Sequence, residues 1–230
     1  MDWSPGSVQT MFDVVAPDYD KLNTLLSGDR DRAWRKAAAA QVQPGSRVLD
    51  LCAGTGPLAR TILARDPTCL VSALDFSAAM ISIGLSKNSP VGLQWLRGDG
   101  LHLPFRNGSF AAITCGFGFR NFNPQGTPAG LAECFRVLKP GGKLIVLEFF
   151  PRPGLVRNFL QRTYLRLVLP FIGDVIWGKK GAYRYLSRTM QEYLTKEQFE
   201  EAVKDSGLRL HFWKDLTFGV CSLVVAEKAG

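Results

Sequence analysis

The segment Arg47–Ala59, RVLDLCAGTGPLA, gives the strongest indication of the fold. A run of apolar residues ends around an acid, Asp50, and the chain then turns through Gly54, Thr55 and Gly56 into a helix-like segment. A strand that passes into a glycine turn and a helix brings bare backbone N–H groups to the carboxyl edge of a parallel sheet, where ligands of this architecture bind. We therefore expect an α/β protein with a binding site at this turn.

Apolar, β-rich runs alternate with helix-like segments along the chain, which is typical of parallel βαβ units. The predicted strands are RVLDLCA, CLVSALDF, LQWLRG, FAAITCGF and KLIVLEFF, with helices over Pro57–Ala64, Ala78–Ser86 and Pro128–Val137. TKEQFEEAVKDSG predicts a later helix with Thr195 as N-cap, and LRLHFWKDL and GVCSLVVAEK predict a closing pair of strands. These elements predict a Rossmann-like, seven-stranded, mostly parallel sheet with helices on both faces and an inserted helical lid.

Composition narrows the class of protein. The chain has 230 residues, 46% of them hydrophobic and 21% charged, which is ordinary for a globular protein with a full core. The N-terminus lacks the features of a signal peptide, and no apolar run reaches the roughly 18 residues of a membrane span, so we predict a cytoplasmic protein. Five cysteines without CxxC spacing predict reduced thiols, and two isolated histidines predict no metal site.

Three acids stand at the ends of successive predicted strands. Asp50 precedes the glycine turn, Asp75 ends the second strand and Asp99 ends the third, at intervals of 25 and 24 residues. Each acid alone fits a helix N-cap or a turn, whereas their joint placement favours a binding site. Three carboxylates would repel a pyrophosphate, and the sequence has neither G-x-G-x-x-G nor a P-loop. The acids suit a ligand with a cationic amine, a ribose diol and an adenine amine.

The turn and the acids are similar to those of class I S-adenosylmethionine-dependent methyltransferases. DLCAGTG resembles the acid-x-G-x-G-x-G loop of that class, with Cys52 where the first glycine usually lies. The resemblance implies S-adenosylmethionine as the cofactor, with Asp75 accepting the ribose hydroxyls, Asp99 accepting the adenine amine and the glycine turn against the methionine and ribose. The implied cofactor residues are Asp50, Gly54, Thr55, Gly56, Asp75, Phe76, Asp99, Gly100 and Gly116.

Further segments narrow the resemblance. APDYDKLNTLLS with RDRAWR, GDGLHLPF, FGFRNF, RVLKPGGKLIVLEF and YRYLSRTM are similar to the ubiquinone/menaquinone biosynthesis C-methyltransferase family, over nearly the whole chain. In that family the methyl group goes to a ring carbon of a polyprenylated quinol. The resemblance therefore implies C-methylation of such a quinol in menaquinone or ubiquinone biosynthesis. It leaves open whether the acceptor is the naphthoquinol, demethylmenaquinol, or the benzoquinol.

The segment FGFRNF carries the residues that we predict to act on the acceptor. A quinol hydroxyl has a pKa of about 10, so its ionisation at neutral pH needs a cation, a hydrogen-bond donor or a base. We predict that Arg120 stabilises the developing oxyanion and that Asn121 orients it. A structural ion pair from Arg120 to an acid is an equally good explanation. Tyr19 and Asp20 are predicted to help close the cofactor pocket, and Tyr19 is also assigned to the substrate side.

A basic segment at residues 151–190 interrupts the sheet pattern. A single acid, Asp174, is outnumbered there by Arg157, Arg162, Arg166, Lys179, Lys180, Arg184 and Arg188. Apolar residues at i, i+3 and i+4 spacing from Val156 to Leu167 predict an amphipathic helix, which would cover an apolar substrate or rest on an anionic membrane surface. An ordinary helix with a solvated basic face fits as well. Tyr183 and Tyr185 are predicted to line the quinol pocket.

These observations predict one methyltransferase domain over residues 1–230, with an N-terminal helical lid at 1–44 and a helical substrate-side insertion at 151–190. The predicted partners are the quinol and, peripherally, the membrane. We predict no nucleic-acid partner, because no base-reading module is present, and a homodimer is left open. Other functions that stay open are methylation of another apolar small molecule, non-catalytic S-adenosylmethionine binding, and a nicotinamide oxidoreductase, although the turn lacks the final glycine of that class.

Overall fold

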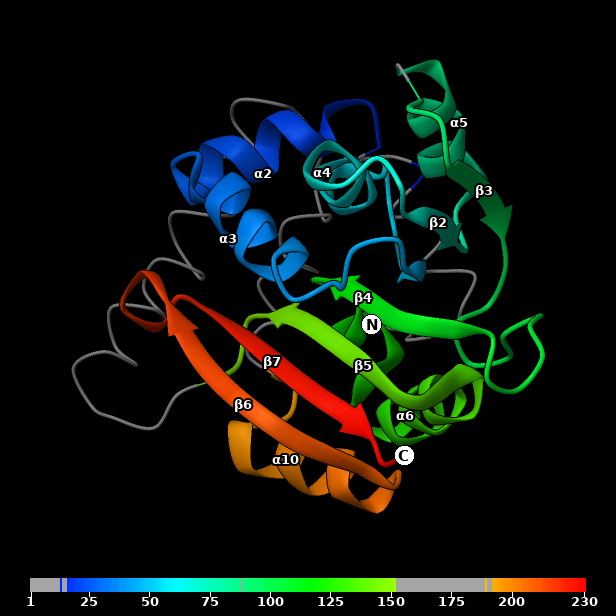
Figure 1. Cartoon of the computed structure of the whole chain (residues 1–230). Helices are drawn as coiled ribbons and strands as arrows, with labels where there is room; N and C mark the ends of the chain where they lie inside the picture. The colour runs from blue at the N-terminus through cyan, green and yellow to red at the C-terminus, as the bar shows by residue number, and fades with distance from the viewer. Residues whose placement is uncertain (1–12, 14–15, 88, 152–188, 190–191) are drawn as a thin grey trace.

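A sheet of seven strands lies at the centre of the structure (Figure 1). The computed structural model describes residues 13, 16–87, 89–151, 189 and 192–230. The strands are β1 Arg47–Leu51, β2 Leu70–Asp75, β3 Leu93–Arg97, β4 Phe110–Gly116, β5 Leu138–Glu148, β6 Leu208–Leu216 and β7 Cys221–Lys228. Their order is β3-β2-β1-β4-β5-β7-β6, with β7 antiparallel to its neighbours and the other pairs parallel. The predicted Rossmann-like sheet is thereby confirmed.

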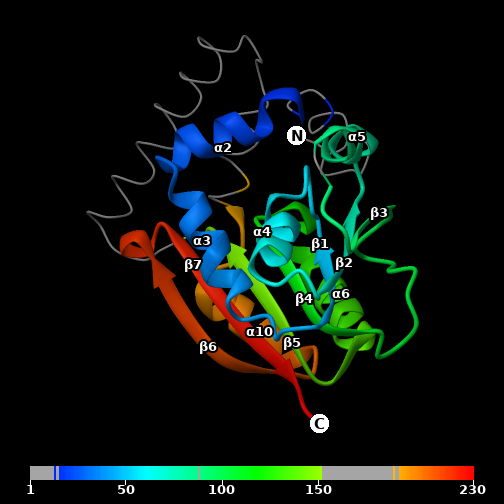
Figure 2. The same cartoon turned by 45° about the horizontal axis from the view of Figure 1, so that its top comes forward.

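Helices cover both faces of this sheet. They are η1 Ala16–Asp18, α2 Tyr19–Ser27, α3 Arg30–Ala39, α4 Pro57–Arg65, α5 Ala78–Ser86, η2 Phe119–Phe122, α6 Asn123–Val137, α10 Lys196–Asp205 and η4 Thr217–Gly219. Figure 1 shows α3 and α4 on one face and α6 and α10 on the other. In Figure 2, α2 lies at the end of the molecule opposite the C-terminus. No helix within the described ranges is long and apolar enough to cross a membrane.

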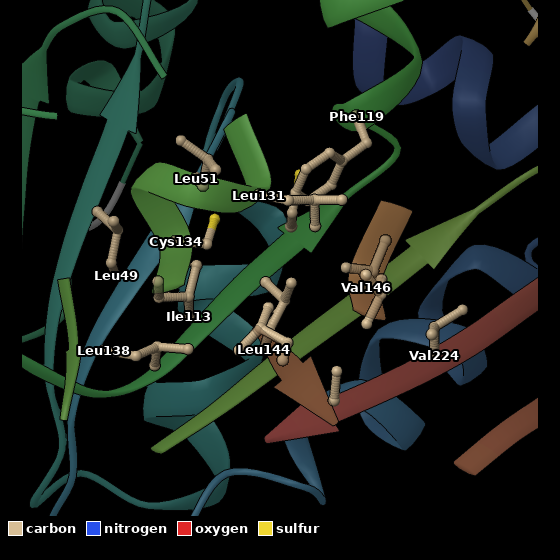
Figure 3. Close-up of a cluster of buried hydrophobic side chains, with 14 of the residues drawn as sticks. Leu49, Leu51, Ile113, Phe119, Leu131, Cys134, Leu138, Leu144, Val146 and Val224 are labelled. Atoms are coloured by element: carbon tan, nitrogen blue, oxygen red, sulfur yellow. The ribbon is translucent and has the colours of Figure 1, made fainter. Parts of the chain in front are cut away.

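Two hydrophobic cores flank the sheet because successive strand residues point to opposite faces. The strand residues in the core on the side of α6 and α10 include Leu49, Ile113, Leu144 and Val146 (Figure 3). Their neighbours in the chain belong to the second core, under α3 and α4, and include Val48, Ala112, Ile145 and Leu147. Burial on both faces explains why these strands appear in the sequence as continuous apolar runs.

Helix α6 begins five residues earlier than predicted, at Asn123 rather than Pro128. Pro124 lies in the first turn, where backbone N–H groups have no partner within the helix, so its missing N–H costs little. The Thr127 hydroxyl donates to the Asn123 carbonyl at 2.7 Å. The sequence prediction treated Pro128 as a helix start, whereas the structure accommodates it inside the helix.

The remaining boundaries agree closely with the sequence prediction, except for the start of β5. Strand β5 begins at Leu138 rather than at Lys143, because Leu138 pairs with Phe110 before the register shifts. The predicted N-cap Thr195 is confirmed: its side chain accepts the N–H of Gln198, and the Gln198 side chain accepts the N–H of Thr195. The start of α10 is therefore defined by local side-chain chemistry.

In this strand order, the expected binding site lies at the carboxyl ends of the neighbouring strands β1 and β4. From β1 the chain continues into α4 on one face, and from β4 it continues through η2 into α6 on the other. Ligands of open α/β sheets bind at such a switch point, outside the carboxyl ends of the strands. The glycine turn and the segment FGFRNF both follow strands that end there.

Candidate active site

The glycine turn after β1 uses the left-handed backbone conformation repeatedly. Cys52 has a φ of 54°, Gly54 of 57° and Gly56 of 80°. The Ala53 N–H donates to the Leu74 carbonyl at 3.0 Å, which joins the turn to β2. Glycine adopts this conformation freely, whereas a cysteine there is strained, so the sequence departure at Cys52 has a structural cost. The turn leads directly into α4, whose first N–H groups border the site.

Asp50 is buried beneath this turn and bonds inward. One carboxylate oxygen accepts the Thr114 hydroxyl at 2.7 Å and the other accepts the Ala59 N–H at 3.1 Å. Burial raises the pKa of the Asp50 carboxyl to about 7, against the lowering effect of these hydrogen bonds. Asp50 therefore ties β1 to β4 and to the start of α4, and its predicted contact with the cofactor stays a prediction.

Asp75 ends β2 beside the turn. Its carboxylate accepts the N–H of Gly54 at 2.7 Å and the N–H of Ser77 at 2.9 Å. Burial raises the pKa of the Asp75 carboxyl, and the hydrogen bonds from Ser77 and Gly54 oppose that rise. A carboxylate oxygen has two lone pairs, so Asp75 can still accept hydroxyl donors from a ligand at the turn. The next residue, Phe76, is 37% exposed at the same edge.

Asp99 follows β3 in a turn of its own. Its carboxylate accepts the Leu101 N–H at 2.9 Å and lies 3.1 Å from Nδ1 of His102. The Asp99 side chain is 44% exposed, which leaves it open to a ligand amine. Gly100 is required for packing, since a Cβ there would lie 2.5 Å from Cζ of Phe122.

Helix α2 of the N-terminal segment reaches the glycine turn. The Thr55 hydroxyl donates to Asp20 at 2.6 Å, and Asp20 also pairs with Lys87 at the end of α5. A Cβ placed on Gly54 would lie 3.8 Å from Cε1 of Tyr19, so the two residues are adjacent. Burial raises the pKa of the Tyr19 hydroxyl, and the charge of Arg120 opposes that rise. Sequence reasoning missed Lys87, because nothing local marks it as a partner of Asp20.

Arg120 lies in η2 and is bound to an acid that the sequence analysis did not single out. Its Nη1 donates to Oε1 of Glu148 at 2.7 Å, and both side chains are buried. The guanidinium also lies over the ring of Phe149, 5.7 Å from its centroid. Oδ1 of Asn121 is buried without a hydrogen-bond partner in the described part of the chain. A signal for Glu148 existed, since an acid at the end of the apolar run KLIVLE needs a partner.

The structure thus places most of the predicted site residues at one edge of the sheet. Gly116 ends β4 there, with Cδ2 of Leu58 at 3.4 Å from a Cβ added to it. The residues at this edge are Tyr19, Asp50, Gly54, Thr55, Gly56, Asp75, Phe76, Asp99, Gly100, Gly116, Arg120 and Asn121. Tyr183, Tyr185 and most of the insertion at 151–190 lie outside the described residues.

Comparison with known proteins assigns this arrangement to a family. The model of the ubiE/COQ5 methyltransferase family matches residues 2–228. The chain belongs to the ubiE/COQ5 methyltransferase family. It is 40% identical to the demethylmenaquinone methyltransferase of Thermus thermophilus, over 95% of this chain and 100% of that one. The ubiquinone/menaquinone biosynthesis C-methyltransferase UbiE of Geotalea daltonii is 36% identical, over 96% of each chain.

Solved structures support the fold of this ubiE/COQ5 family member. The [4+2]-cyclase SpnF has a TM-score of 0.71 at 18% identity, over 96% of this chain and 95% of that chain. A methyltransferase in complex with the Trm112 activator of Haloferax volcanii has a TM-score of 0.68 at 20% identity, over 95% and 98%. Because a cyclase shares the fold, the architecture alone does not define the reaction.

Proposed function

We propose that this ubiE/COQ5 family member transfers the methyl group of S-adenosylmethionine to a ring carbon of a polyprenylated quinol, in menaquinone or ubiquinone biosynthesis. The observation that carries the proposal is similarity over essentially the whole length of relatives named demethylmenaquinone methyltransferase, at 39–40% identity for the two from Thermus thermophilus and Deinococcus radiodurans. Relatives named UbiE match over the same extent at 36% identity. Both quinol classes are therefore acceptors to test.

The residues at the carboxyl edge fit S-adenosylmethionine. Gly54 and Gly56 have no side chain and positive φ, so a ligand can approach their backbone. Asp75 beside them offers acceptors to a ribose diol, and Asp99 offers acceptors to the adenine amine. Thr55 is buried and held by Asp20, which keeps the turn in place. Negative charge at this edge also suits a cationic ligand.

The acceptor side requires a group that makes the ring carbon electron-rich. S-adenosylmethionine supplies an electrophilic methyl group on a sulfonium. Arg120 stabilises the oxyanion that develops when the quinol hydroxyl loses its proton, directly or through a water molecule, and Asn121 offers a buried acceptor that can orient that hydroxyl. Holding the ring in line with the methyl group supplies several kcal/mol of the rate enhancement. The proton leaves to water or to a carboxylate, because an arginine guanidinium stays protonated and is therefore a poor base.

The prenyl tail of the quinol requires an apolar or membrane-facing surface. Residues 1–44 serve as a lid over the cofactor, and residues 151–190 serve as the substrate-side insertion with Tyr183 and Tyr185 at the ring. The basic composition of the insertion suits a cytoplasmic protein that touches the anionic inner face of the membrane, alone or as a homodimer.

The first experiment is incubation of the purified protein with methyl-labelled S-adenosylmethionine and reduced naphthoquinol or benzoquinol acceptors with short prenyl tails. Mass spectrometry locates the methyl group. We expect transfer to a ring carbon of at least one acceptor, and the preferred acceptor distinguishes the two pathways. The Arg120→Lys variant should bind S-adenosylmethionine normally and turn over more slowly.

Two outcomes would count against the proposal. No transfer to either acceptor, with cofactor binding intact, would favour another acceptor or a non-catalytic binding protein. Full turnover by Arg120→Lys and Arg120→Ala would remove Arg120 from the mechanism while leaving the reaction itself in place.

A further inference from the structure

Glu148 is the last residue of β5 and lies inside the protein, with 0% of its surface exposed. It follows the apolar run Leu144–Leu147, whose side chains fill the two cores. An ionised carboxylate in such surroundings is costly unless hydrogen bonds and an opposite charge compensate it. The structure supplies both at the carboxyl edge of the sheet.

Within the described part of the chain, three hydrogen bonds converge on this carboxylate. Oε1 accepts Nη1 of Arg120 at 2.7 Å and the N–H of Phe149 at 2.9 Å. Oε2 accepts the backbone N–H of Arg120 at 3.2 Å. Glu148 therefore binds Arg120 at two points, the guanidinium and the main chain, and the bond to its own neighbour Phe149 restrains the carboxylate.

Two-point binding restricts more than one side chain. With its backbone and guanidinium both held, Arg120 has little freedom to change rotamer, and the ring of Phe149 lies against the guanidinium. The next residue, Asn121, is tied through its N–H to the Gly118 carbonyl at 3.0 Å. Its Oδ1 is buried and has no hydrogen-bond partner among the described residues, as expected of an acceptor kept for a ligand hydroxyl.

We infer that Glu148 is a positioning residue for methyl transfer, an inference that rests on the proposed function. It acts through Arg120 and the η2 backbone and does not touch the quinol. A buried ion pair is a poor device for stability alone, because well-packed apolar residues often serve as well or better. Here the ion pair keeps the guanidinium of Arg120 and the adjacent amide acceptor of Asn121 oriented before the quinol binds.

The test compares Glu148→Gln and Glu148→Asp with wild type in the methyl-transfer assay. Glu148→Gln keeps the shape but removes the charge and places an amide N–H against the Arg120 N–H. We expect kcat to fall roughly 10- to 100-fold, as for a catalytic group misplaced by about 1 Å, with the Kd for S-adenosylmethionine within about threefold of wild type. Glu148→Asp keeps the charge on a shorter arm and should retain more of kcat. Wild-type kcat in both variants would overturn the inference.

A matched control and a double variant separate positioning from general destabilisation. Glu133→Gln removes a carboxylate that likewise binds an arginine, Arg136, and a backbone N–H, that of Leu103, outside the proposed catalytic residues. It should leave kcat unchanged. Because Glu148 acts through Arg120, the double variant Arg120→Ala/Glu148→Gln should match the kcat of Arg120→Ala alone. Losses that multiply would show that Glu148 acts independently of Arg120, and the inference would fail.

One readout does not depend on turnover. The ¹⁵N resonance of the Arg120 Nε–H group, assigned by its absence in Arg120→Lys, should be sharp in wild type and shifted or broadened in Glu148→Gln. An unchanged resonance would contradict the positioning role even if no quinol were methylated. If the wild-type protein is inactive and the resonance is nevertheless shifted in Glu148→Gln, the result would count against the proposed function alone.

Discussion

Asp50 and Asp75 are the same residue type near the ends of neighbouring strands, yet their side chains have different surroundings. Asp50 points inward, to the Thr114 hydroxyl and the Ala59 N–H, whereas Asp75 lies against the glycine turn. Both were predicted from the sequence as cofactor residues. At the scale of one residue, the direction of the side chain gives the two acids different local partners, while the predicted contact of each with the cofactor stays a prediction.

Stability should depend on pH through Asp50. Its pKa is raised from 3.8 to about 7 in the folded protein, so between pH 4 and pH 7 the folded state keeps a proton that the unfolded state loses. The free energy of unfolding should therefore fall as pH rises through this window, by up to about 1.4 kcal/mol per unit from this group, and level off above pH 7.

The measurement compares chemical denaturation of wild type and Asp50→Asn from pH 4 to pH 8. The asparagine side chain titrates in neither state, so the stability of the variant minus that of wild type should increase up to pH 7 and then stay constant. A difference that is flat from pH 4 to pH 7 would show that Asp50 titrates normally in the folded protein.

Cys52 offers a test of backbone strain. It has a φ of 54°, which costs a residue with a Cβ about 1–2 kcal/mol and glycine almost nothing. Cys52→Gly and Cys52→Ala both remove the thiol, but only alanine keeps the strained conformation. We expect the glycine variant to be more stable than the alanine variant by about 1 kcal/mol in thermal or urea unfolding. The opposite order would mean that the turn relaxes away from the left-handed region.

At the scale of elements, α5 packs on β3 and the glycine turn through Trp95. The indole fills the space beside two glycines: a Cβ on Gly84 would lie 2.3 Å from its ring, and one on Gly56 would lie 2.6 Å away. Arg60 joins the same elements by donating to the carbonyls of Thr55 and Gly84, each at 2.6 Å. The turn is therefore shaped by neighbouring helices as well as by its own residues.

Gly84→Ala should destabilise the protein although alanine favours helices. The Cβ would overlap the Trp95 ring, and overpacking of this kind costs typically 1–3 kcal/mol. Gly126→Ala in α6 is the matched control, because its nearest neighbour would lie at an ordinary 3.5 Å, and it should stabilise by up to about 1 kcal/mol. Unfolding midpoints of the two variants should lie on opposite sides of wild type. Equal midpoints would mean that Trp95 moves aside without cost.

At the scale of the whole molecule, segments far apart in the sequence meet at one edge of the sheet. Helix α2 reaches the glycine turn through Asp20, and Asp20 in turn binds Lys87 of the region after α5. Next to the outermost strand β6, the η4 turn contacts α3, and Nε1 of Trp34 donates to the Thr217 hydroxyl at 2.8 Å. Binding at this edge should therefore stabilise the whole fold.

S-adenosylmethionine at 100 times its Kd should stabilise the protein by about 2.7 kcal/mol, which corresponds to a rise in Tm of roughly 5–10 °C for a chain of this size.

Asp20→Ala removes the acceptor of the Thr55 hydroxyl and should weaken cofactor binding about 5- to 10-fold, the effect of roughly 1–1.5 kcal/mol. Arg32→Ala, which breaks an exposed ion pair with Asp29 in the same N-terminal region, is the control. It should change neither the affinity for S-adenosylmethionine nor the rise in Tm that the cofactor causes. Equal affinity in Asp20→Ala and wild type would show that the turn holds its shape without α2.

The fold class, the glycine turn and the edge of the sheet at which the predicted site residues gather could all be predicted from the sequence. These features follow from local chemistry: apolar runs of strand length, glycines where φ must be positive, and acids placed at strand ends. Even the N-cap at Thr195 is confirmed, because capping depends on residues three apart. The predicted roles of Tyr183 and Tyr185 stay predictions, since both residues lie outside the described structure.

The contacts between distant side chains could not be predicted from the sequence and became apparent in the folded molecule. Glu148 binds Arg120 across 28 positions of sequence, and Thr55 binds Asp20 across 35. Such pairs depend on how two faces of distant elements are turned toward each other, which no local pattern encodes. The same physics gave Asp50 an inward direction and a raised pKa, because burial and partners belong to the packed molecule and not to the residue type.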